Sequence, residues 1–116
     1  MNRYKLSKAG IDANQGIWRF SGNKEEYERC LNSFRADTHF EQMLSAIEAQ
    51  DVKSAFSAAH AIKGMAGNLS MNALYESIIP LLEVFRADTF DGMEPHLTQV
   101  KADYQRVMDA LRTETE

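Results

Sequence analysis

Apolar residues recur through most of the chain at steps of three and four, which is the period of a helix with one buried face. The pattern divides into one short helical stretch over 12–20 and four longer ones over 24–50, 51–67, 71–87 and 95–111. Residues 1–11 lack the pattern, and we expect them to form an irregular lead-in. No stretch alternates with the period of a β-strand. The sequence therefore predicts an all-α fold.

The four longer segments are amphipathic and are joined by short turns. They predict an antiparallel four-helix bundle with a short additional helix at the N-terminus. One boundary is left open, because Asp37 and Thr38 could cap a fresh helix inside 24–50, which would then be two helices rather than one. Pro80 lies inside 71–87, where it removes a backbone hydrogen bond and should kink the helix.

Capping residues mark several of the expected helix ends. Asp12 and Asn23 each precede a helical stretch and are followed three residues later by Gln or Glu, as in a capping box. Asp51 can cap the central helix, and Ser70 can cap the helix after it. Between these two helices Gly67 and Asn68 are the residues that best tolerate a left-handed helix end, so we expect the turn there.

The central helix has two distinct faces. Its buried stripe consists of apolar residues at helical spacing, namely Val52, Ala55, Ala59, Ile62, Ala66 and Leu69. His60, Lys63, Gly64 and Gly67 form a second i, i+3, i+4, i+7 set on a different face. A glycine inside a helix costs about 1 kcal/mol relative to alanine. Gly64 therefore suggests that a partner approaches this face closely, and we interpret His60 as the group that the partner contacts.

Length, composition and charge limit the kinds of protein that this chain can be. With 116 residues, 44% of them hydrophobic and 26% charged, we expect one globular domain over 1–116. The net charge of -4 and the lack of a basic run interleaved with aromatics argue against nucleic acid or an anionic membrane as partner. Cys30 is the single cysteine, and no apolar run is long enough for a signal peptide or a membrane span. We expect a cytoplasmic protein without membrane insertion.

One motif on the central helix is similar to a known signature. HAIKG at 60–64, followed by AGNL at 66–69, resembles the His-x-x-Lys-Gly signature of histidine-containing phosphotransfer (HPt) domains, which act in multistep phosphorelays of two-component signalling. The resemblance covers nearly the whole chain, with similar residues at 10–12, 19–23, Tyr27 and 49–51. The motif also falls on the third long segment of an all-helical chain of suitable length.

The resemblance implies a role for each residue of the motif. His60 would be the phosphorylated nucleophile, Lys63 would neutralise the phosphate, and Gly64 would leave clearance for the partner. The implied partners are response-regulator receiver domains and a hybrid sensor histidine kinase, with Mg²⁺ held by the receiver and no cofactor on this chain, which we expect to be a monomer. Many members of the family carry a glutamine near the histidine where this chain has Leu82, which cannot supply the same hydrogen bond.

The chemistry of the residues agrees with this implication. An exposed imidazole is neutral in a large share of molecules near pH 7 and then has a free ring nitrogen that can attack phosphorus. Lys63, one turn away, supplies a point charge for phosphoryl oxygens. The sequence contains no GxxxxGK[ST] loop and no carboxylate cluster, so we expect a phosphocarrier without kinase activity of its own.

Two other classes of protein are alternatives to the phosphocarrier. A helical-bundle adaptor would bind a signalling partner without chemistry, and its Lys63 and Gly64 would serve packing alone. A metal or cofactor bundle is disfavoured because paired Glu-x-x-His motifs are missing. His39 and His96 are interpreted as surface or capping residues. The sequence leaves open the identity of the partners, the direction of phosphate flow, and whether the chain is free-standing or part of a hybrid kinase.

Overall fold

The structure is a computed structural model that describes residues 1–115, without the side chains of 113–115. The described chain forms seven helices and no strand: α1 (Arg3–Lys8), α2 (Ala13–Arg19), α3 (Lys24–Phe34), α4 (His39–Glu48), α5 (Val52–Asn68), α6 (Asn72–Arg86) and α7 (Glu94–Thr115). The all-α prediction is confirmed. The irregular lead-in expected over 1–11 is wrong in part, because α1 lies there and buries Leu6 while Asn2 caps its first turn.

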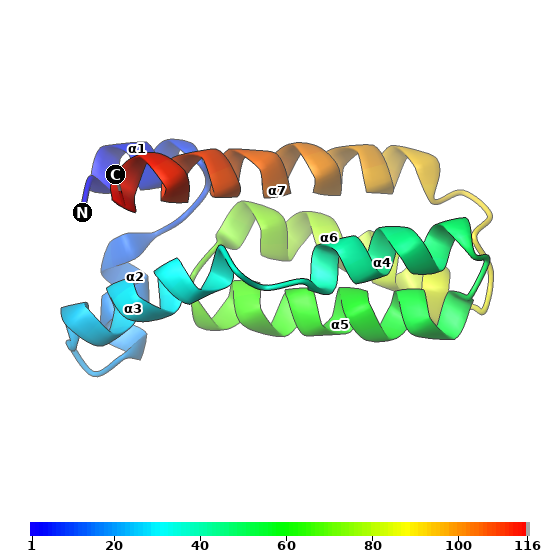
Figure 1. Cartoon of the computed structure of the whole chain (residues 1–116), viewed down its shortest axis with the longest axis horizontal. Helices are drawn as coiled ribbons and strands as arrows, with labels where there is room; N and C mark the ends of the chain where they lie inside the picture. Colours follow the sequence, from blue (N-terminus) through cyan, green and yellow to red (C-terminus); the bar gives the residue numbers. More distant parts are fainter. Residues whose placement is uncertain (116) are drawn as a thin grey trace.

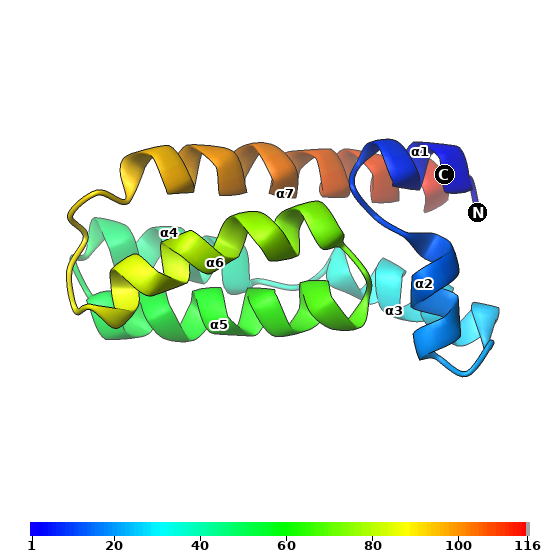
Figure 2. The ribbon, with the colours of Figure 1, turned by 180° about the vertical axis from the view of Figure 1, so that it is seen from behind.

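Helices α4, α5, α6 and α7 lie side by side and run in alternating directions (Figures 1 and 2). This arrangement confirms the antiparallel four-helix bundle. Helix α3 leads into α4 after a break at residues 35–38, so the stretch 24–50 is two helices. At the break the Asp37 carboxylate accepts a hydrogen bond from the backbone N–H of His39 at 2.9 Å, whereas the Thr38 side chain makes no capping bond.

Aromatic side chains connect the two parts of this broken helix to α7. The ring of Phe40 on α4 stacks on Tyr104 of α7 at a centroid distance of 3.9 Å, and Phe34 at the end of α3 lies 6.0 Å from the same ring. All three side chains belong to the continuous buried core. The break therefore interrupts the backbone of the helix without opening the core.

The short helices α1 and α2 lie at the end of the bundle where α5 turns into α6 (Figure 2). The backbone N–H of Asp12 donates to the carbonyl of Ser70 at 2.9 Å, and the N–H of Ala73 donates to the carbonyl of Gly10 at 3.2 Å. From α3, the buried Tyr27 hydroxyl donates to the Leu69 carbonyl at 2.7 Å. These bonds fix α2 and α3 against the α5–α6 turn.

The α5–α6 turn differs from the prediction in two ways. Helix α5 continues through Gly67, and Ser70 rather than Gly67 has the left-handed conformation, with φ 55°. Ser70 also does not cap α6, which follows Met71 without a side-chain capping bond. The reason is a Schellman-type ending, in which the N–H of Met71 donates to the Ala66 carbonyl at 2.9 Å and requires the left-handed residue between them.

The predicted caps at the other helix starts are confirmed. The side chains of Asp12, Asn23 and Asp51 accept hydrogen bonds from backbone N–H groups three residues later, at 3.0, 3.0 and 3.1 Å. The Ser54 hydroxyl also donates to the Asp51 carboxylate at 2.6 Å, and this bond, together with the bond from the Ser54 backbone N–H, holds the pKa of the Asp51 carboxyl below its ordinary value. Helix α6 runs as one element from Asn72 to Arg86 with Pro80 inside it.

Candidate functional site

Helix α5 separates its buried stripe from the face that carries His60. Five of the six residues predicted for the stripe are buried, namely Ala55, Ala59, Ile62, Ala66 and Leu69. Val52 is half-buried, and His60 is exposed. This separation follows from the 100° step of the helix, which cannot place a residue at position 60 on the stripe of 55, 59, 62 and 66. The imidazole is therefore available at the surface of a helix whose other side is fixed in the core.

A surface cavity of about 630 Å³ lies beside this face. Its lining comes from three helices: Gln15 and Arg19 of α2, His60, Lys63, Gly64, Gly67 and Asn68 of α5, and Asn72, Tyr75 and Glu76 of α6. The structure thus brings together all four residues that the helical spacing placed on one face. The residues from α2 and α6 were not anticipated from the sequence.

His60 has free ring nitrogens within the described part of the chain. Neither nitrogen has a hydrogen bond or an ion pair there, and the ring lies 6.0 Å from that of Phe56, one turn earlier, at an angle of 32°. His39 differs, because its Nδ1 lies 2.8 Å from an Asp37 carboxylate oxygen at the start of α4. Of these two histidines, only His60 offers nitrogens without competing partners.

Lys63 places a positive charge at the cavity. Its ammonium nitrogen lies 5.7 Å from the centroid of the Tyr75 ring, a cation–π arrangement. No described carboxylate forms an ion pair with Lys63. Its charge can therefore interact with an anion that enters the cavity.

The two glycines of this face have different surroundings. A Cβ atom built on Gly64 meets no atom within 4 Å, and Gly64 is exposed inside the helix. A Cβ on Gly67 would lie 3.2 Å from Cε2 of Tyr75, so Gly67 allows that ring to pack on α5. No described residue explains why position 64 lacks a side chain, whereas Tyr75 explains it at Gly67.

Leu82 lies in the core with 2% of its surface exposed. Its apolar side chain offers no hydrogen bond to the imidazole. Over the described residues, no group of three His, Cys, Asp or Glu side chains could hold a metal ion. In the same part of the chain, every helix is too short or too polar to cross a membrane.

Comparison with protein families identifies the class of this bundle. The sequence model of the Hpt domain family matches residues 34–110, about two thirds of the chain, and the chain belongs to this family. The match includes α4, α5 and α6 and leaves α1 and α2 outside. Hpt domains are phosphocarriers of phosphorelay signalling that interact with receiver domains and kinases of two-component systems. Neither the curated proteins nor the solved structures gave a match.

Proposed function

We propose that this protein is a phosphorelay intermediate that accepts a phosphoryl group on His60 from a receiver-domain aspartate and passes it to another receiver domain. The observation that supports the proposal most is the position of His60, whose unpaired ring nitrogens lie at the cavity beside Lys63 in a chain of the Hpt family. The helix presents the nucleophile without a lid or a competing hydrogen bond from a described residue.

The transfer step needs a neutral imidazole. One ring nitrogen keeps its proton, while the lone pair of the other attacks the phosphorus of the aspartyl phosphate. A nitrogen–phosphorus bond forms, the bond from phosphorus to the aspartyl oxygen breaks, and the aspartate leaves as a carboxylate. In the second transfer a carboxylate oxygen of the next receiver attacks the phosphorus, and the imidazole leaves with its original protonation.

Lys63 and Gly64 contribute charge and space to this step. The Lys63 ammonium would attract the phosphoryl oxygens as charge builds on them in the transition state. The open surface at Gly64 would let the receiver approach His60 closely. The chain needs no cofactor of its own in this scheme, because the Mg²⁺ that neutralises the aspartyl phosphate belongs to the receiver.

We place the exchange in the cytoplasm, with a monomer of this protein moving between a hybrid sensor histidine kinase and a response regulator. The half-buried free thiol of Cys30 is compatible with a reducing compartment.

Incubation with a phosphorylated receiver tests the proposal. Wild-type protein should acquire an acid-labile, base-stable phosphate, and His60→Gln should acquire none while keeping its helical circular-dichroism spectrum. His96→Gln is the matched control and should be labelled like the wild type. Label on His60→Gln would overturn the assignment. A receiver that binds the wild type without transferring phosphate would instead identify an adaptor.

A further inference from the structure

Helix α2 forms a wall of the His60 cavity although it lies outside the segment that matches the family. Arg19 in its last turn and Gln15 one turn earlier both line the cavity. Arg19 is therefore the second cationic side chain of the lining, together with Lys63, and Glu76 is the carboxylate among them. The cavity offers a guanidinium, an ammonium and several amides around one imidazole.

The position of α2 relative to His60 is defined by specific bonds. The Asn72 side-chain amide donates to the Gln15 side-chain carbonyl at 3.2 Å, which connects α2 to the start of α6 inside the cavity lining. The backbone bond from Asp12 to Ser70 fixes the first turn of α2 to the end of α5. Arg19 thus projects from a helix that is held against the two helices forming the rest of the site.

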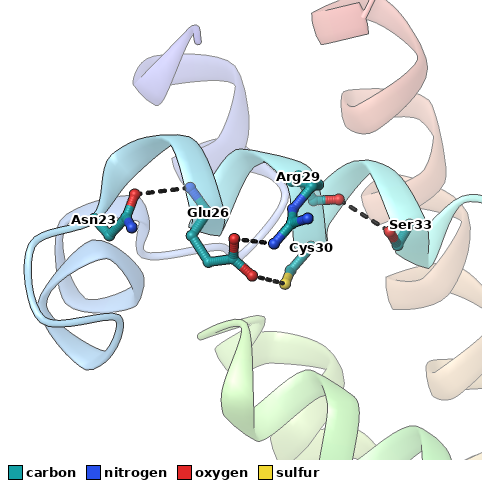
Figure 3. A network of polar contacts seen from close by, with 5 residues as sticks. All are labelled: Asn23, Glu26, Arg29, Cys30 and Ser33. Carbon is teal, nitrogen blue, oxygen red and sulfur yellow. Dashed lines mark hydrogen bonds and ion pairs between the residues drawn. The ribbon is translucent and has the colours of Figure 1, made fainter.

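The Arg19 guanidinium has no ion-pair or hydrogen-bond partner among the described residues. Arg29 on the neighbouring α3 is different, because its guanidinium is already paired with the Glu26 carboxylate (Figure 3). Arg86 is likewise paired with Glu83 at 2.9 Å. A planar guanidinium with free donors matches the geometry of phosphoryl oxygens and can bind two of them at once.

We propose that Arg19 is a phosphate-binding residue of the His60 site, which contacts the phosphoryl oxygens from the α2 wall while Lys63 contacts them from α5. This inference rests on the proposed function. It assigns a part in the transfer to α2, a helix outside the matched family segment.

Two measurements test the contribution of Arg19. The first is a titration of unphosphorylated protein with inorganic phosphate, followed by the NMR signals of the His60 ring. The second is the rate at which His60 is labelled, measured with two donors. One donor is phosphoramidate, a small molecule that needs no receiver, and the other is a phosphorylated receiver. The variants are Arg19→Gln, the charge-conserving Arg19→Lys, and Arg29→Gln as a control with the same change of charge outside the cavity.

Arg19→Gln should weaken phosphate binding and slow both labelling reactions by about tenfold, as expected for a lost charge-assisted hydrogen bond. Arg19→Lys should bind phosphate and be labelled more nearly like the wild type, and Arg29→Gln should equal the wild type in both measurements. The melting temperatures of all three variants should lie within a few degrees of that of the wild type. Wild-type phosphate binding and labelling in Arg19→Gln would overturn the inference. Slower labelling by the receiver alone would also overturn it and show that Arg19 contacts the receiver. If the wild type cannot be labelled at all, the proposed function fails, and the titration still decides whether Arg19 binds phosphate.

Discussion

Gly16 and Gly64 both lie inside helices, but the space around them differs. A Cβ on Gly16 would lie 2.2 Å from the ring of the buried Tyr27, so this position has no room for a side chain. A Cβ on Gly64 would meet nothing within 4 Å. Gly16 is required by packing within the fold, whereas none of the described residues requires glycine at position 64, as expected if the open space serves an approaching partner.

Gly64→Ala should therefore stabilise the isolated protein by up to about 1 kcal/mol, because alanine has the better helix propensity and a less flexible unfolded state. Transfer from a phosphorylated receiver should nevertheless weaken, and Gly64→Leu should weaken it further, while labelling by phosphoramidate should change far less. Denaturant unfolding beside the two labelling assays measures all three effects.

Gly16→Ala is the matched control. Its added methyl group must displace the Tyr27 ring, so the protein should lose stability by about 1–3 kcal/mol, as is usual for overpacking. Parallel losses of stability, receiver transfer and phosphoramidate labelling in Gly64→Ala would contradict the clearance role and place Gly64 in the same category as Gly16.

At the scale of the elements, the helix ends show which structural features the local sequence pattern could predict. The caps at Asp12, Asn23 and Asp51 are local features, because each involves a side chain and an N–H group three residues later. Helix α1 was missed because six residues with one buried leucine carry too little periodicity. The turn at Ser70 was misassigned because the glycine nearest to it, Gly67, is used to pack Tyr75.

Ser70 itself combines two unfavourable features. It has a positive φ of 55°, and its buried hydroxyl has no hydrogen-bond partner among the described residues. Ser70→Gly should relieve both, and we expect the free energy of unfolding to rise by about 1 kcal/mol after the extra flexibility of glycine in the unfolded chain is subtracted. Denaturant unfolding measures the gain.

Gln50 provides the comparison, since it occupies the equivalent left-handed position after α4, with φ 58°, but is exposed. Gln50→Gly relieves only the unfavourable backbone conformation, so its free energy of unfolding should rise by less than that of Ser70→Gly. A loss of stability in Ser70→Gly would show that the Ser70 hydroxyl has a stabilising partner, and the account of this turn would then be wrong.

At the scale of the whole molecule, the candidate site divides into a local part and a tertiary part. His60, Lys63 and Gly64 could be grouped from the sequence because they lie on one helix, where spacing alone decides which residues share a face. Arg19 and Tyr75 could not, because their places depend on contacts between different helices. The bond from Asn72 to Gln15, 57 residues apart, holds α2 against α6, and Tyr75 of α6 packs on Gly67 of α5. Helical periodicity contains no information about those contacts.

Stability of the whole bundle should depend on pH in the alkaline range through Tyr104. Burial, together with the carboxylates of Glu41 and Asp37, raises the pKa of Tyr104 from 10.0 to about 12, and its ring connects α7 to α4 by stacking on Phe40. Below pH 10 the phenol is protonated in both the folded and the unfolded chain, and its contribution to stability is fully present. Between pH 10 and 12 the unfolded chain loses the proton first, so stability falls as pH rises, by up to about 1.4 kcal/mol per pH unit for one proton.

Denaturant unfolding at intervals from pH 8 to 11.5 checks this dependence. The buried Tyr27, whose pKa is also raised by burial, should add to the slope. Tyr104→Phe keeps the aromatic ring and removes the ionisable group, so it should unfold like the wild type at pH 8 and show a shallower loss above pH 10. The exposed Tyr4 is the control, and Tyr4→Phe should leave the slope unchanged. An equal slope in Tyr104→Phe and the wild type would mean that Tyr104 ionises at the same pH in the folded and unfolded chains.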